Sequence, residues 1–83
     1  MITHKQLLKH KFITSTATHD SPFYMHGTIN GVLSGGIFHF PIVGEWCQCK
    51  NINHLKWLFK KHTGNKLEPF NENEWAIISG IVN

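Results

Sequence analysis

Arginine is absent from this chain of 83 residues, and all eight of its basic residues are lysines. Arginine makes the bidentate hydrogen bonds that read guanine edges and clamp phosphate groups, whereas lysine supplies a single point charge. The formal net charge of +3 is enough for non-specific contact with a phosphate backbone. The composition therefore argues against a sequence-specific DNA-binding protein.

Long apolar runs are also absent. No stretch approaches the roughly 18 apolar residues that a membrane-spanning helix needs, and residues 1–6 are too polar for the core of a signal peptide. We therefore expect a soluble, cytoplasmic protein with no membrane partner.

Cysteine occurs twice, at Cys47 and Cys49, in a C-x-C arrangement. A secreted domain stapled by disulfides would carry several spaced cysteines. We expect both residues to be reduced thiols.

Apolar residues are plentiful, because they make up 41% of the chain against 16% charged residues. Nine Ile, six Phe and three Trp supply enough apolar surface for a core without disulfides or a metal, so residues 1–83 are expected to form a single domain. The abundance of Ile, Lys and Asn without Arg is typical of an AT-rich gene, which suggests a low-GC bacterium, a phage or another mobile element as the source.

The first part of the chain predicts a short helix and a strand. Thr3 followed by Gln6 has the form of a capping box, and His4–Lys11 can form two helical turns. Phe12–Thr18 is rich in β-branched residues and predicts a strand, which the turn-forming residues 19–22 would end.

A hairpin is predicted next. Apolar and polar residues alternate over Phe23–Ile29, and Asn30-Gly31 then favours a type I′ turn into a strand that starts at Val32. This register predicts a core face made of Phe23, Met25, Ile29, Val32, Phe38 and Phe40. The opposite face would carry Tyr24, His26, Ile37 and His39. A bulge at Gly35-Gly36 would reverse the facing of everything after it, and that alternative stays open.

The most regular pattern in the chain predicts a helix over Ile52–Thr63, preceded by a short strand over Glu45–Cys49. Asn51 is a good N-cap for this helix, and Gly64 is a good C-terminal stop. Helical spacing places Ile52, Leu55, Leu58, Phe59 and His62 on one stripe. The opposite side would carry Asn53, His54, Trp57, Lys60 and Lys61.

The C-terminal part predicts a loop and a strand. Pro69 interrupts Leu67–Phe70, and Asn71–Glu74 is acidic and loop-like. Trp75–Val82 is apolar on both alternating faces and predicts a buried final strand. Together the elements predict an α+β fold, with an antiparallel sheet of three to five strands, one main helix and a short N-terminal helix.

The cysteines and histidines give weak evidence for chemistry. Cys47, Cys49, His54 and His62 are the clustered potential ligands, but structural zinc sites usually space their cysteines as C-x2–4-C. Either cysteine could also pair with His39 or His54 as a catalytic dyad, yet no third group or oxyanion turn is evident. We therefore expect no metal, no cofactor, no catalytic residue and no enzymatic activity.

Two surfaces are candidates for partner binding. The polar side of the main helix carries Trp57 among Lys56, Lys60, Lys61 and His54, where a large aromatic could anchor a protein interface or stack on a nucleobase. Alternatively, Trp57 packs under the N-terminal helix or the final strand. The second surface is the sheet face with Tyr24, His26 and His39, if helices cover the other side alone.

The favoured hypothesis is a small interaction module that binds a protein partner stoichiometrically, such as an accessory regulator or inhibitor of a mobile element. The alternatives are a non-specific nucleic-acid-binding protein that uses the lysines and Trp57, and a metal-binding or catalytic protein that uses Cys47, Cys49 and histidines. The oligomeric state and the identity of the partner do not follow from the sequence.

Overall fold

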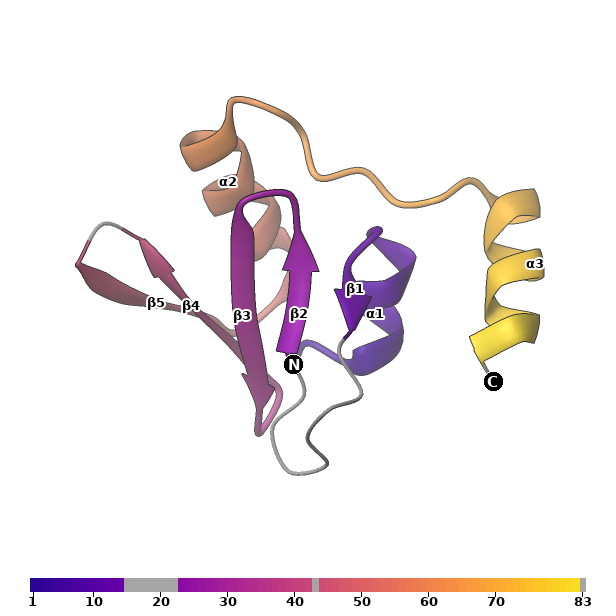
Figure 1. Cartoon of the computed structure of the whole chain (residues 1–83), viewed down its shortest axis with the longest axis horizontal. Helices are drawn as coiled ribbons and strands as arrows, with labels where there is room; N and C mark the ends of the chain where they lie inside the picture. The colour runs from indigo at the N-terminus through magenta and orange to yellow at the C-terminus, as the bar shows by residue number, and fades with distance from the viewer. Residues whose placement is uncertain (15–22, 43, 83) are drawn as a thin grey trace.

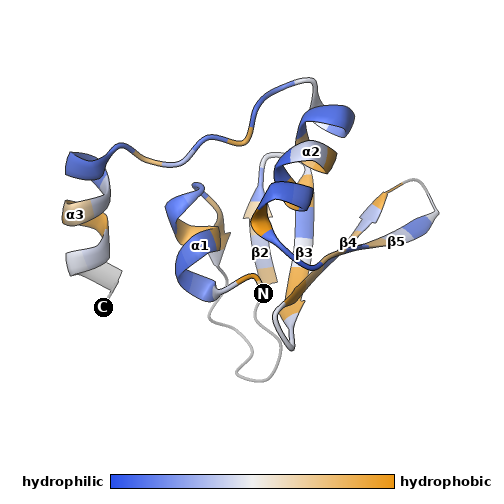
Figure 2. Cartoon of the chain, turned by 180° about the vertical axis from the view of Figure 1, so that it is seen from behind, coloured by the Kyte–Doolittle hydropathy of each residue, from blue (hydrophilic) through white to orange (hydrophobic). Residues whose placement is uncertain are grey.

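A five-stranded antiparallel sheet with helices on one side is the framework of the computed structural model, which describes residues 1–14, 23–42 and 44–82. The strands follow the chain order β1-β2-β3-β4-β5. Figures 1 and 2 view the molecule from opposite sides and place α1 and α2 on the same side of the sheet. The predicted α+β class is confirmed. The elements are α1 (His4–Lys9), β1 (Ile13–Thr14), β2 (Phe23–His26), β3 (Ile29–Ser34), β4 (Ile37–Ile42), β5 (Glu45–Cys49), α2 (Ile52–Thr63) and α3 (Glu72–Val82).

Helix α1 begins at the predicted capping box. The Gln6 N–H donates to the Thr3 hydroxyl over 3.2 Å, and the Thr3 N–H donates to the Gln6 side-chain oxygen over 3.0 Å. These two bonds satisfy backbone donors that a helix start leaves free. The helix ends at Lys9, two residues before the predicted end, and buries Leu7 and Leu8. Of the predicted strand over Phe12–Thr18, Ile13–Thr14 forms β1, and residues 15–22 lie outside the described part.

The β2–β3 hairpin turns at Gly27-Thr28, so the predicted turn at Asn30-Gly31 is wrong. His26 pairs with Ile29, and Gly31 lies inside β3 opposite Tyr24. Gly27 has a φ of 61°, which suits the first central position of a type II′ turn. Gly31 serves packing instead: a Cβ there would lie 2.5 Å from a Phe38 ring carbon and 2.5 Å from the His39 carbonyl oxygen.

The β3–β4 hairpin turns at Gly35-Gly36, where the sequence had suggested a bulge. Ser34 pairs with Ile37 across this two-residue turn. Both glycines have positive φ, 60° and 79°, as a type I′ turn requires. The residues from Ile29 to Ile42 therefore form two paired strands, β3 and β4, joined by this tight turn.

The new register reverses the facing of β2. Tyr24 is 1% exposed and lies in the core, whereas Phe23 and Met25 are exposed. The predicted core face is therefore wrong at these two positions, and Val32 is only half-buried. Ile29, Phe38 and Phe40 are buried, as expected. Tyr24, Phe12 and Phe40 all lie near Phe38 as an aromatic cluster, with ring centroids 5.4–6.3 Å from that of Phe38.

The sheet side that faces away from α1 and α2 is called the outer sheet face below. Residues directly opposite one another in antiparallel strands point to the same side, so the register identifies its members. They are Ile13, Phe23, Met25, Asn30, Val32, Ser34, Ile37, His39, Pro41, Trp46 and Gln48.

Strand β5 and helix α2 have the bounds that the sequence predicts. The Asn51 side-chain oxygen accepts from the His54 N–H over 2.9 Å, and Gly64 ends the helix with a φ of 76°. Leu55, Leu58 and Phe59 are buried on the predicted stripe. His62 was assigned to the same stripe but is exposed, because the last turn of α2 extends past the sheet (Figure 1).

Residues 72–82 form helix α3, so the predicted final strand and the predicted loop over Asn71–Glu74 are both wrong. Asn71 caps this helix: its side-chain oxygen accepts from the Glu74 N–H over 2.8 Å, and the Glu74 carboxylate accepts from the Asn71 N–H over 3.4 Å. Asn71 followed by Glu74 is a capping-box pattern that the sequence contains. The helix lies at the far end of the longest axis, with α1 between it and α2 (Figure 1).

No helix in the described ranges combines the length and the apolar character that a membrane crossing requires.

Candidate interaction groove

Four of the predicted binding residues line one groove. Lys56, Trp57, Lys60 and Lys61 of α2 form one wall, and the extended segment 66–69 forms the other. The groove has a volume of about 650 Å³ and opens to solvent. The structure therefore brings together the α2 part of the predicted site.

Helix α2 positions these side chains because its other face is fixed in the core. Leu55, Leu58 and Phe59 are buried, and successive residues are rotated by about 100°. Trp57 and Lys61 must therefore point outward. The Trp57 side chain is 58% exposed, which confirms the expectation of partial exposure and excludes the alternative of a core tryptophan.

The indole of Trp57 has a neighbour from the preceding turn and one from the following turn of α2. The His54 ring lies 6.3 Å away, centroid to centroid, at an interplanar angle of 28°. The Lys61 Nζ lies 5.0 Å from the indole centroid, which is the geometry of a cation–π contact. The exposed apolar ring therefore has an imidazole on one side along the helix and an ammonium group on the other.

The second wall of the groove is the segment Lys66–Pro69, which sequence reasoning missed. Leu67 is 3% exposed and belongs to the core, so it holds this extended segment beside α2. The next residue after the segment, Phe70, donates its N–H to the Lys9 carbonyl oxygen over 2.9 Å. The sequence shows that Pro69 interrupts Leu67–Phe70, but no periodic pattern shows which helix such a segment will follow.

The charge of the groove is unbalanced. It contains the ammonium groups of Lys56, Lys60, Lys61 and Lys66 against the single carboxylate of Glu68. Between them lie the apolar surfaces of Trp57, Leu67 and Pro69. A ligand that fits would combine negative charge with an apolar side chain.

Tyr24 and His26 do not reach the solvent face on which they were predicted, because the hairpin turn occurs three residues earlier than expected. The Tyr24 hydroxyl lies 2.6 Å from His4 Nδ1, and burial raises the pKa of Tyr24. The His26 ring packs against Phe12 and Phe59, with centroid distances of 5.3 and 4.8 Å. Burial also lowers the pKa of His26.

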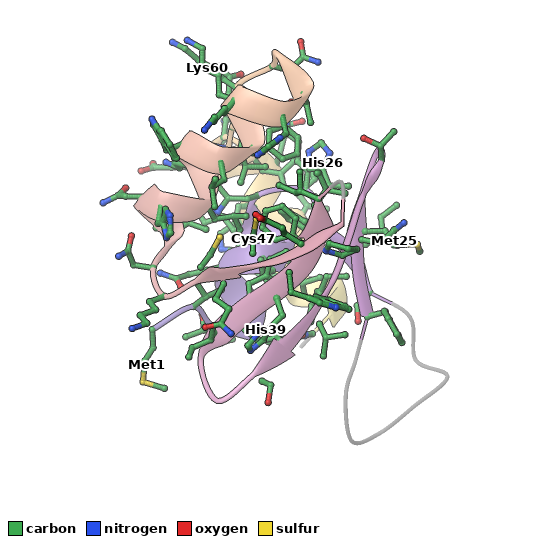
Figure 3. All side chains as sticks on the ribbon, turned by 90° about the vertical axis from the view of Figure 1, so that its left-hand side faces the viewer. Met1, Met25, His26, His39, Cys47 and Lys60 are labelled. Carbon is green, nitrogen blue, oxygen red and sulfur yellow. The ribbon has the colours of Figure 1, made fainter. Side chains whose placement is uncertain are left out.

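His39 does lie on the outer sheet face, where it is half-buried in β4 opposite Val32 and Gln48. Figure 3 shows His26 close to α2 and His39 further along the sheet, with Lys60 at the outer end of α2. Phe23 and Met25 occupy the places on this face that were assigned to Tyr24 and His26. The predicted open sheet face thus exists with different members on β2.

The candidate metal ligands are not gathered at one point. Among the side chains that the structure describes, no three of His, Cys, Asp or Glu come close enough to hold a metal ion. His54 and His62 lie eight residues apart on α2, which is about 12 Å along a helix axis. Cys49 is buried, and burial together with the nearby Cys47 raises its pKa to about 12. A thiol with that pKa is protonated at neutral pH, which makes it a poor nucleophile.

Comparison with protein-family models, with curated proteins and with solved structures finds no match to this chain.

Proposed function

We propose that this chain is a small non-enzymatic interaction module that binds an acidic, partly apolar segment of a protein partner in the α2 groove. The observation that supports this proposal is the exposed Trp57 ring in the lining of a groove that carries four lysines. Tryptophan in a concave, mostly apolar site is the residue type that most often dominates binding energy at protein interfaces.

The two kinds of side chain have different roles in this proposal. Burial of the indole and of the neighbouring Pro69 provides the apolar part of the affinity. The lysines select acidic segments and accelerate their association, because exposed charges contribute more to rate and specificity than to affinity.

Binding of single-stranded nucleic acid is the second candidate, because the four lysines of the groove could follow a phosphate backbone. A base that stacks on Trp57 would compete with the His54 ring and the Lys61 ammonium for the indole, since both lie beside it. A protein side chain can instead contact the free edge of the ring. We therefore favour the protein partner.

The test compares Trp57→Ala with Trp46→Ala. Trp46 is 65% exposed on β5 and lies outside the groove, so it controls for the loss of an exposed indole. The probe is a fluorescent synthetic helical peptide rich in Glu and Leu. Trp57→Ala should weaken its binding by about 2 kcal/mol, or roughly 30-fold, and should change the free energy of unfolding by less than about 1 kcal/mol.

A salt series with oligothymidylate distinguishes the second candidate. Phosphate contacts weaken steeply with ionic strength, whereas apolar contacts do not. If oligothymidylate binds with a steep salt dependence and the peptide does not bind, the nucleic-acid function replaces the protein one. Equal loss of peptide binding in both tryptophan variants would remove the groove as the site.

A further inference from the structure

In the described part of the chain, α1 and α2 lie on the other side of the sheet, and no helix covers the outer sheet face (Figures 1 and 2). Four of its side chains are large, apolar and exposed: Ile13 is 67% exposed, Phe23 49%, Met25 40% and Trp46 65%. Ile13, Phe23 and Met25 lie on the neighbouring strands β1 and β2, with the half-buried Val32 opposite Phe23 on β3, and Trp46 lies on β5 opposite Pro41. Exposed apolar residues grouped on one face in this way favour an interaction site.

The composition of this face differs sharply from that of the groove. None of its residues is Asp, Glu or Lys. All eight lysines of a chain with a net charge of +3 therefore lie elsewhere. An acidic or a basic partner would find no complementary charge on this face.

These two facts favour a second copy of the same chain as the occupant. Two copies repel each other wherever lysines face lysines, and the outer sheet face is a surface on which they can meet without opposing charges. A face without charged residues also presents no like-charge pairs to a copy of itself, as a twofold symmetric interface requires.

We propose that two copies of this chain associate through their outer sheet faces, so that the two sheets pack face to face. Stacked sheets lie about 10 Å apart, with side chains of the two inner faces interdigitated. The exposed rings of Phe23 and Trp46 supply the bulk that fills such a layer. The α2 grooves lie on the other side of each sheet, so the dimer presents two grooves.

The test uses two charged variants of the full-length chain. One carries Met25→Lys with Trp46→Lys, and the other carries Met25→Glu with Trp46→Glu. Both positions are exposed, so the substitutions leave the core intact. In sedimentation velocity, the wild-type chain should be a dimer and each variant alone should be a monomer, because like charges oppose one another across the interface. An equimolar mixture should form a dimer again, because Lys then faces Glu.

The restored dimer in the mixture excludes misfolding as the reason for dissociation. Ile77→Lys is the matched control, because Ile77 is equally exposed, at 68%, but lies on α3; this variant should remain a dimer. A monomeric wild-type chain would overturn the proposal. So would a dimer that persists in both charged variants, because its interface would lie elsewhere, such as along the edge strands β1 or β5.

The proposed dimer and the proposed peptide-binding function of the groove can be tested independently. Trp57→Ala should weaken peptide binding and leave the dimer intact, whereas the charged outer-face variants should bind the peptide as monomers. Loss of the dimer in Trp57→Ala would place the groove in the dimer interface and overturn this proposal.

Discussion

Tyr24 shows how a polar tip is accommodated in the core of this protein. Its ring is 1% exposed and packs edge-on against Phe38, while its hydroxyl reaches His4 at the surface. The sequence places Tyr24 on the solvent face because it predicts the hairpin turn at Asn30-Gly31, whereas the turn lies at Gly27-Thr28. Its role in the structure is to fill the core between α1 and the sheet.

Tyr24→Phe tests this role. The substitution keeps the ring and removes the 2.6 Å contact between the hydroxyl and His4 Nδ1. Because one partly buried hydrogen bond contributes about 1 kcal/mol net, urea unfolding should show a loss of about that size. Binding of the acidic peptide should be unchanged. A variant with normal stability and weaker binding would return Tyr24 to the functional surface.

At the scale of elements, glycine decides the register of the sheet. Gly31 lies where the Phe38 ring and the His39 carbonyl approach the β3 backbone. Glycine in a strand often marks such a close approach of backbone or side chain.

Gly31→Ala should therefore be strongly destabilising, because its Cβ would lie 2.5 Å from atoms of β4. Forcing an extra methyl group into a packed site costs about 1–3 kcal/mol. Gly80→Ala is the control, since a methyl group at Gly80 meets nothing within 4 Å and alanine favours a helix. Urea unfolding of both variants tests the register. Equal stability of the two would show that Phe38 and the His39 carbonyl do not approach Gly31 this closely.

Sequence patterns predicted the elements whose ends are fixed by local hydrogen bonds. The capping box of Thr3 and Gln6 and the N-cap Asn51 act on residues three positions away, so they can be recognised without tertiary structure. The hairpin could not be predicted in this way. Both Gly27-Thr28 and Asn30-Gly31 can form tight turns, and the choice depends on where the Phe38 ring packs.

Helix α3 illustrates a different difficulty. Its apolar residues lie on both alternating faces, which favours a buried strand, and the β-branched residues support the same interpretation. The cap formed by Asn71 and Glu74 is the local signal that identifies a helix. The second wall of the groove was missed for a tertiary reason, because Leu67 reaches the core across a segment that has no regular structure.

At the scale of the whole molecule, two histidines couple folding to pH. His10 is 6% exposed, and its Nδ1 donates to the Gln6 carbonyl oxygen over 2.7 Å. Burial lowers its pKa, with smaller contributions from Lys56 and Lys9, and the bond to Gln6 opposes the shift. For His26, burial followed by Lys11 lowers the pKa. Both residues are therefore neutral in the folded state at pH values where the unfolded chain begins to protonate them.

This difference predicts lower stability in acid. The unfolded histidines bind protons near pH 6.5, before the folded ones do, so the unfolded state gains protons first as the pH falls. The free energy of unfolding should therefore be highest above about pH 6.5 and should decrease as the pH is lowered further. His26→Leu removes one of the two groups and should make the fall shallower in urea titrations at several pH values. If the free energy of unfolding of His26→Leu decreases with pH as steeply as that of the wild-type chain, His26 does not cause the decrease.

The separation of α3 from the core gives the last prediction. The buried core cluster extends from Ile2 to Leu67 and includes no described residue of α3. Phe70 holds the chain to α1 through its bond to the Lys9 carbonyl and a cation–π contact with Lys11.

A chain that ends after Asn71 should therefore still unfold cooperatively and lose no more than about 2 kcal/mol of its free energy of unfolding. A chain that ends after Asn65 also loses the buried Leu67, which should cost a further 2–5 kcal/mol or so, as for other large core side chains. Thermal unfolding of both truncations measures the difference, and a non-cooperative transition in the longer one would show that α3 is part of the core.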